Sequence, residues 1–318
     1  MAAFAPAASP LSPSTLGIHV GRSLATGRGG VRPPMAAHVA AAAAAAAAAG
    51  IRLGAFQIFG AGPRHRSITL GDEEIAELSA LGAENGYRYL LHNSYMAPPW
   101  SGVPPYEEVI REQLRICGRL SSSVDEPAGL VVHLGRSPPA EVTRIMPRLQ
   151  IETEGVMPLL LLEVAAVRPE HSQYADVAGI RELFRLIREG PDPTLARTGF
   201  VLDTAHLWAC GTDISDAENM DAIIQGIVED DAVPPNRLVF HLNDSHNDFG
   251  SGSDRHAPLF GGKIWRSHAA APAAAGAAAV LRYADVHRCA VILERGGGVD
   301  MAEDYRRLRP LVSPACRC

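Results

Sequence analysis

Cysteine is scarce in this 318-residue chain, and its five cysteines are scattered along the sequence. An odd number of widely spaced cysteines argues against a disulfide framework and favours a reducing, intracellular compartment, nuclear or cytoplasmic. The terminal pair Cys316-x-Cys318 is expected to be part of a frayed tail rather than a metal clip.

Long apolar runs are also missing. The best candidate, residues 36–49, is almost pure alanine, carries a histidine and is shorter than the roughly 20 strongly apolar residues that a membrane span needs. Residues 1–15 are rich in Ala, Ser and Pro but contain no basic segment, so we predict a disordered leader and no secretory signal. We therefore expect no membrane partner.

Positive charge is not in excess, because 29 Lys and Arg stand against 35 Asp and Glu, a formal net charge of −6. This balance does not by itself indicate a nucleic-acid partner, although three bound divalent ions would cancel it. The chain is 47% hydrophobic and 20% charged, which is typical of a protein that buries a large core.

Apolar segments alternate with segments of helical periodicity along the chain. The pattern predicts strands at 16–21, 54–59, 88–92, 129–133, 158–163, 199–203, 237–241 and 290–294. It predicts helices at 33–50, 72–84, 106–120, 140–149, 174–188, 217–229, 269–283 and 302–308. The first of these contains the alanine tract, which composition alone would leave as a disordered insert. Proline opens it and glycine follows it, as expected of helix boundaries, and we interpret it as a helix because it lies between two strand-like segments.

Continuously apolar strands that alternate with helices predict a parallel sheet covered on its outer face. Eight such units favour an α/β fold of the (β/α)₈ TIM-barrel type, with residues 16–310 as one domain and 311–318 as a tail. A doubly wound open sheet is the alternative, but no Gly-x-Gly-x-x-Gly fingerprint follows a strand.

Six predicted strands in succession end in a residue type that binds metals. A barrel would bring all six to the C-terminal rim, where active sites of this architecture lie. These residues are His92, His133, Glu163, Asp203, His241 and Glu294. Three more candidates, His206, Asp254 and His256, lie in the loops that follow. Asp254 and His256 are two positions apart, so an extended segment would point both to the same side.

One polar residue at a strand end usually satisfies backbone groups, but six in succession indicate a site. Nine candidates exceed the three or four ligands of one zinc ion, so we predict more than one metal. Histidine-rich ligation favours Zn²⁺, with Mn²⁺ as a possible substitute. Clustered metals are typical of hydrolases that act on phosphate esters. His19 is a further candidate to face the same pocket.

Two sequence blocks, GFVLDTAHLWACGTDI and HLNDSHNDFGSGSDRH, together with VVHLG, LLLLE and ILE, resemble the endonuclease IV family of apurinic/apyrimidinic (AP) endonucleases. The resemblance covers roughly Leu16–Leu308 and implies a zinc-dependent, monomeric enzyme of base excision repair. Such an enzyme would cut double-stranded DNA 5′ to an abasic site, leave a 3′ hydroxyl and trim blocked 3′ ends.

The resemblance also implies roles for single residues. His92, His133 and Glu163 would hold a first zinc ion. Glu163 would bridge to a second ion held by Asp203, His241 and Glu294, and a third would take His206, Asp254 and His256. Glu163 and Glu294 would be catalytic, with Glu294 acting as general base as well as ligand.

Two DNA contacts are implied by the same resemblance. Tyr95 would lie beside the abasic site, and Arg64 would fill the gap in the base stack. A tyrosine packed on the barrel rim and a solvated surface arginine are the alternatives. The chain departs from the family after Glu163, where Val-Ala-Ala-Val replaces the usual Asn-Thr/Ser-Ala-Gly, so this loop is expected to be reshaped.

Two other functions remain open. A sugar isomerase or epimerase on a related barrel needs one metal and a pair of carboxylates, and it has no use for the Asp254-x-His256 pair. A catalytically inactive protein that binds damaged DNA would be expected to have lost ligands, and none is missing from the sequence.

Overall fold

The structure is a computed structural model that describes residues 15–21, 33–121, 128–151, 157–190, 197–295 and 301–312. Nearly all of the predicted leader and the last six residues of the tail, with Cys316 and Cys318, lie outside the described residues. Among the described helices, none combines the length and the apolar character that a membrane crossing requires.

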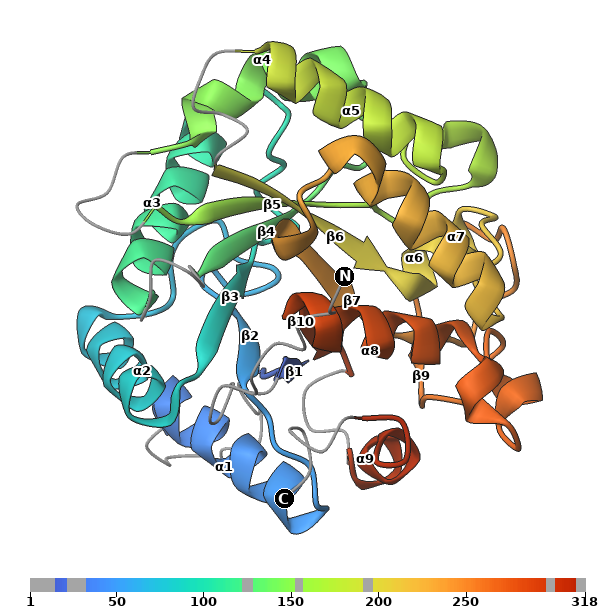
Figure 1. Cartoon of the computed structure of the whole chain (residues 1–318). Helices are drawn as coiled ribbons and strands as arrows, with labels where there is room; N and C mark the ends of the chain where they lie inside the picture. Colours follow the sequence, from blue (N-terminus) through green and yellow to red (C-terminus); the bar gives the residue numbers. More distant parts are fainter. Residues whose placement is uncertain are drawn as a thin grey trace, which may run out of the picture.

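Eight parallel strands form a closed barrel in the order β1-β10-β7-β6-β5-β4-β3-β2 (Figure 1). This arrangement confirms the predicted TIM barrel. The strands are β1 (Leu16–His19), β2 (Ala55–Phe59), β3 (Arg88–His92), β4 (Gly129–His133), β5 (Leu159–Glu163), β6 (Thr198–Asp203), β7 (Leu238–His241) and β10 (Ala290–Leu293). Because all eight run the same way, their last residues meet at one rim.

Helices surround the barrel on its outer side (Figure 1). They are α1 (Met35–Ala48), α2 (Asp72–Asn85), α3 (Pro104–Leu120), α4 (Pro139–Leu149), α5 (Val177–Glu189), α7 (Ala217–Val228), α8 (Gly276–His287) and α9 (Ala302–Leu308). A short extra helix, α6 (Thr204–Ala209), follows β6 directly. The alanine tract is helical as predicted, and α1 buries Met35, Val39 and Ala46 against the barrel.

The periodicity of α5 shows why these segments become helices. Its apolar residues recur every three or four positions, and Ile180, Leu183, Phe184 and Ile187 are buried as one stripe. Asp176 caps the helix by accepting a hydrogen bond from the Gly179 amide at 2.8 Å.

Two apolar layers support the rim. The larger layer lies between strands and helices, and the smaller fills the barrel interior with side chains such as Leu90, Val131, Leu161 and Val201. Each buried aliphatic side chain stabilises the fold by about 1.5–3 kcal/mol relative to an exposed one. The interior layer packs directly beneath the polar residues at the strand ends.

The structure corrects some predicted boundaries. The helix expected at 269–283 begins only at Gly276, because Pro272 lies in a separate 3₁₀ turn (Pro272–Ala274) and lacks the amide hydrogen that a helix interior needs. The first strand ends at His19 rather than at residue 21. The sequence pattern also missed α6 and the small antiparallel pair β8 (Asp244–Ser245) and β9 (His256–Ala257).

Candidate metal centre

The nine predicted ligand residues are gathered at the C-terminal rim. Strand register accounts for part of this, since His133 pairs with Glu163 and Asp203 pairs with His241 across neighbouring strands. Potential ligand atoms within 4.8 Å of one another form three groups that share members. The inner groups are His92, His133 and Glu163 (the first group) and Glu163, Asp203, His241 and Glu294 (the second group), and the outer, third group is Asp203, His206 and His256.

The first group is centred on one oxygen of Glu163. Its Oε2 atom lies 2.9 Å from His133 Nε2 and 3.4 Å from His92 Nε2. The other ring nitrogen of His92 donates to the Asn93 carbonyl at 2.8 Å. In the neutral imidazole the Nε2 lone pair of His92 is therefore left facing the carboxylate, as a metal ligand requires.

The second group is centred on His241, which is completely buried. Its Nδ1 atom lies 2.9 Å from Glu163 Oε1, 3.0 Å from Glu294 Oε2 and 3.7 Å from Asp203 Oδ2. Three carboxylates therefore surround one ring nitrogen in a site where His241, Glu163 and Asp203 are fully buried and Glu294 is 14% exposed. Such an arrangement is costly unless positive charge lies between the groups.

The third group takes two residues from elements that follow the barrel strands, His206 from α6 and His256 from β9. His256 Nε2 is 2.8 Å from Asp254 Oδ1 and 3.9 Å from Asp203 Oδ2, and His206 Nε2 is 3.3 Å from Asp254 Oδ2. The structure thus places Asp254 in contact with both histidines, and it adds Asp203, which the sequence assigned only to the second ion. Asp203 also caps α6 by accepting from the His206 amide at 2.9 Å, so one carboxylate joins the inner and outer groups.

Burial and charge act in opposite directions on these residues. Burial alone would lower the pKa of His256, but the Asp254 carboxylate, 2.8 Å from Nε2, and the nearby charge of Asp203 raise it to about 9. Burial would raise the pKa of Glu163, but the charges of His133 and His241 hold it well below its usual range. In the metal-free protein, protonated imidazoles therefore supply the positive charge among the carboxylates.

The donor set fits divalent metal ions. Two buried atoms, Glu163 Oε2 and His256 Nε2, have no hydrogen bond of acceptable geometry, although ligand-type atoms surround both. His206 and His256 resemble His92, since their Nδ1 atoms contact the carbonyls of Val164 at 2.8 Å and Glu294 at 2.6 Å. Three imidazoles are thereby held with Nε2 toward the centre, which is how proteins orient metal-binding histidines.

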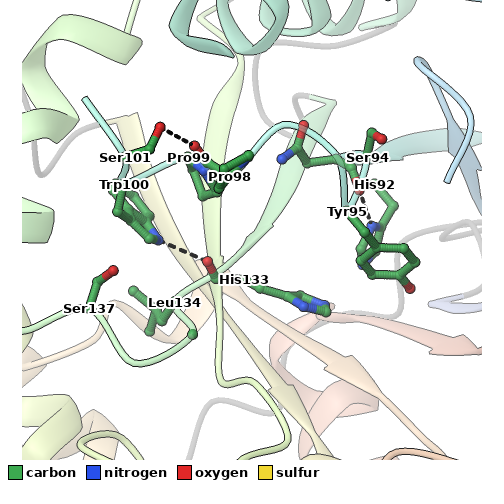
Figure 2. Close-up of a pocket in the computed structure, with 12 residues that line it drawn as sticks. His92, Ser94, Tyr95, Pro98, Pro99, Trp100, Ser101, His133, Leu134 and Ser137 are labelled. Carbon is green, nitrogen blue, oxygen red and sulfur yellow. Dashed lines mark hydrogen bonds between the residues drawn. The ribbon is translucent and has the colours of Figure 1, made fainter. Parts of the chain in front are cut away.

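A pocket of about 360 Å³ opens beside the first group (Figure 2). It extends from His92 and His133 to the walls formed by Pro98 and Trp100, and the Trp100 indole donates to the His133 carbonyl at 2.8 Å. Tyr95 borders this pocket with 59% of its surface exposed, and its ring centre lies 5.6 Å from those of both histidines.

The loop that carries Arg64 lies against the loop that carries Tyr95. The Tyr95 amide donates to the Pro63 carbonyl at 3.2 Å, and the Ser94 hydroxyl donates to the His65 carbonyl at 2.5 Å. Arg64 itself is exposed. The two predicted DNA-contacting residues therefore occupy one edge of the rim, next to the first group, and their roles in binding stay a prediction.

Comparisons with known proteins agree with this geometry. A family model described as a xylose isomerase-like TIM barrel matches residues 43–277. A probable AP endonuclease of African swine fever virus is 32% identical over 247 residues, which cover 77% of this chain and 80% of that protein. A probable endonuclease 4 of Chloroflexus aggregans is 30% identical over 284 residues, which cover 83% and 90%. The chain belongs to the endonuclease IV family of AP endonucleases.

Solved structures give the same result. The crystal structure named AsfvAP:AG superposes with a TM-score of 0.83 at 28% identity, covering 94% of this chain and 99% of that one. Endonuclease IV from Thermus thermophilus gives a TM-score of 0.67 at 26% identity, with coverage of 93% and 97%. The family resemblance noted in the sequence is confirmed.

This endonuclease IV family member brings its nine candidate ligand residues together despite the altered loop after Glu163. The loop contributes through its backbone, because the Val164 carbonyl contacts His206 and the Ala165 carbonyl accepts from the Cys210 thiol at 3.3 Å. Backbone carbonyls are present whatever the side chain, so the Val-Ala-Ala-Val substitution leaves these contacts available. The three cysteines of the described residues, Cys117, Cys210 and Cys289, are free and buried.

Two amide side chains of the centre, Asn243 and Gln57, were not predicted from the sequence. Asn243 donates to Asp203 Oδ2 at 2.7 Å and to Glu294 Oε2 at 3.1 Å, and it accepts from the Glu294 amide at 2.9 Å. Gln57, on β2, contacts His241 and Glu294. The available signal was a glutamine inside the otherwise apolar strand GAFQIF, where a polar side chain needs a partner.

His19 faces the centre, as the sequence suggested. Its Nδ1 atom lies 3.1 Å from Gln57 Nε2 and 3.9 Å from Glu294 Oε1. Burial lowers the pKa of His19 to about 4 against the opposing effect of Glu294. His19 is therefore neutral at physiological pH and can accept a hydrogen bond at Nδ1.

Proposed function

We propose that this protein is a zinc-dependent AP endonuclease of base excision repair. It hydrolyses the phosphodiester 5′ to an abasic site in double-stranded DNA and leaves a 3′ hydroxyl. The main support is the set of three adjoining ligand groups, joined through Glu163 and Asp203, in a member of the endonuclease IV family. A site for one metal would not require the outer group.

Divalent ions bound in these groups would supply positive charge that activates water and offsets charge on the phosphate oxygens. Three zinc ions fit the number of groups, and Mn²⁺ is the substitute that we expect to support activity. The first ion would take His92, His133 and Glu163. Glu163 is shared with the second group, so the same carboxylate would bind both the first and the second ion.

Glu294 is placed to act as the general base. Burial would raise its pKa, but the charge and hydrogen bond of His241 hold the pKa below its usual range, so the carboxylate is ionised at neutral pH. Asn243 Nδ2 holds Glu294 Oε2 from one side at 3.1 Å. The ionised carboxylate can accept a proton from an attacking water while the surrounding hydrogen bonds keep its orientation fixed.

Tyr95 and Arg64 are proposed to contact the DNA around the lesion. The exposed Tyr95 ring stands over the first group and can stack against a sugar or base, while Arg64 extends from the adjacent loop. Trimming of blocked 3′ ends is proposed from the same centre, because that reaction also hydrolyses a phosphate ester. The protein is expected to act as a monomer.

Incision of a duplex with one tetrahydrofuran abasic analogue tests this function. We expect a cut 5′ to the analogue that is lost on prolonged chelation and restored by zinc, with the matched undamaged duplex left intact. Zinc-loaded protein that fails to cut would contradict the proposal. Isomerisation of a ketose by such a preparation would instead indicate the sugar-active alternative, and tight binding of the lesion without cutting would indicate an inactive damage-binding protein.

A further inference from the structure

Gln57 is a completely buried side chain with hydrogen-bonding partners on two ligand residues. It lies on β2, where it pairs in register with His19 of β1 and Leu90 of β3. Its Oε1 atom is 2.9 Å from His241 Nε2, and its Nε2 atom donates to Glu294 Oε1. A neutral amide is one of the few groups that can accept at one end and donate at the other.

His241 differs from three other histidines of the centre. His92, His206 and His256 contact backbone carbonyls through Nδ1, which leaves Nε2 for a metal. His241 is reversed, since its Nε2 faces Gln57 and its Nδ1 faces the carboxylates of the second group. The partner that sets its orientation is therefore a side chain, which substitution can remove.

The surroundings of Gln57 fix which way its amide points. The Nε2 end meets Glu294 Oε1 and, at 3.1 Å, His19 Nδ1, both of which can accept. The opposite orientation would place the amide oxygen against the Glu294 carboxylate. The Oε1 end is thus committed to His241, where it can only accept, so it selects the imidazole form with a proton on Nε2.

We propose that Gln57 is a positioning residue that makes His241 present Nδ1 to the second metal and holds the Glu294 carboxylate beside it. This inference rests on the metal centre of the proposed function. It predicts that the two ends of the amide have separable effects, because an acceptor at position 57 sets the proton on His241 whereas the donor acts only on Glu294.

Two variants separate these effects. Gln57→Leu has a similar size but neither accepts nor donates. Gln57→Glu retains an acceptor for His241 Nε2, as in the carboxylate–histidine–metal arrangement, and replaces the donor to Glu294 with a carboxylate oxygen that repels it. The acceptor effect of this variant is therefore measured on the His241 ring and not by zinc affinity. Gln113→Leu is a matched control, since Gln113 is also completely buried but donates to Asn93 and contacts none of the second group.

The primary measurement is a zinc titration of metal-free protein against a competing chelator. We expect Gln57→Leu to lower the affinity for one zinc ion by about 10–100-fold, the usual effect of losing such a supporting contact. The affinities for the other zinc ions should not change. Gln113→Leu should titrate like the parent protein.

Long-range ¹⁵N spectra of labelled histidine supply a readout independent of affinity. With His241 assigned by substitution, its ring should show a protonated Nε2 and a metal-shifted Nδ1 in the parent protein and in Gln57→Glu, but not in Gln57→Leu. Unchanged zinc affinity and an unchanged His241 spectrum in Gln57→Leu would overturn the proposal. A His241 ring in Gln57→Glu with the same spectrum as in Gln57→Leu would overturn it as well, because an acceptor at position 57 would then have no effect.

These measurements do not depend on DNA cleavage. Protein that binds zinc as expected but leaves abasic DNA uncut would contradict the proposed function and still report on Gln57.

Discussion

The inner two groups and the outer group of the centre use the same residue types, but their ligands lie on different kinds of structural element. Glu163, Asp203 and His241 are fully buried at the ends of barrel strands. Asp254 lies on the loop after β8 and His256 begins the short strand β9, with 38% and 15% of their side chains exposed. Strand register therefore fixes the inner ligands, whereas contacts between loops must hold the outer ones.

Those loop contacts tie the outer ligands to α6. The Trp208 indole donates to the Asn247 carbonyl at 3.1 Å, and the Gly250 amide donates to the Trp208 carbonyl at 3.0 Å. The Gly252 amide donates to the Ala209 carbonyl at 2.9 Å. Because α6 also carries His206, helix and loop form one unit. We therefore expect substitution of inner residues to abolish incision and substitution of outer residues to weaken binding of one metal ion.

The largest loss of incision is expected from Glu294→Gln, which alters a residue of the second group. It removes a negative charge and the candidate base, so incision should fall by about 10²–10⁴-fold, the usual contribution of general base catalysis, or further if a metal is lost. Rates on the abasic duplex, with melting curves to establish folding, test this. Glu303→Gln removes an exposed carboxylate on α9 and serves as the control. Wild-type rates in Glu294→Gln would disprove its assignment.

His256→Ala tests the outer group directly. We expect the variant to lose the outermost of the three zinc ions and keep the inner two, because His256 belongs to the third group and to neither of the others. Elemental analysis after gel filtration measures the zinc content, and His171→Ala, an exposed histidine, is the matched control. Three tightly held equivalents in His256→Ala would refute its role as a ligand.

Gly252→Ala should perturb the outer group through the backbone. Gly252 has a φ of +68°, and an added Cβ would lie 2.7 Å from the Arg168 amide nitrogen. The strain should cost about 1–3 kcal/mol of unfolding free energy and weaken the outer zinc alone. Gly135→Ala is the control, since Gly135 has a φ of +62° with open space around it. Equal losses in the two variants, measured by denaturant titration, would exclude a specific contribution of the Arg168 contact.

The smallest effect concerns pH in the metal-free protein. The nearby carboxylates outweigh burial and raise the pKa of His256 to about 9, and the pKa of His206 is raised well above 6.5. A raised histidine pKa contributes stability that is complete below about pH 6.5 and is lost as pH rises through the folded value.

Chelator-treated protein should therefore lose unfolding free energy between about pH 6.5 and 9, and zinc-loaded protein should lose less, because metal ions replace the protons. His256→Ala should reduce the slope of the metal-free protein. Denaturant titrations at several pH values measure this, and rising stability of the metal-free protein across the window would contradict it.

Much of the fold was accessible from the sequence, because each strand is a continuous apolar run and each intervening segment has helical periodicity. The polyalanine helix was predicted from its place between two strand-like segments and its flanking Pro and Gly. The start of α8 was not, since alanine favours a helix on both sides of Pro272 and only the missing amide hydrogen decides the boundary. Short elements such as α6 carry too few residues for a periodic signal.

By itself, the sequence determined the barrel and the nine ligand-type residues, because strand ends of one barrel must share a rim. The family resemblance also implied the first two groups, whereas the contacts that join the groups were visible only in the tertiary structure. It placed Asp203 in both the second and third groups and put Gln57 against His241 and Glu294. The physical reason is that side-chain hydrogen bonds join residues as far apart as 57 and 294, and one sequence carries no periodic pattern for such contacts.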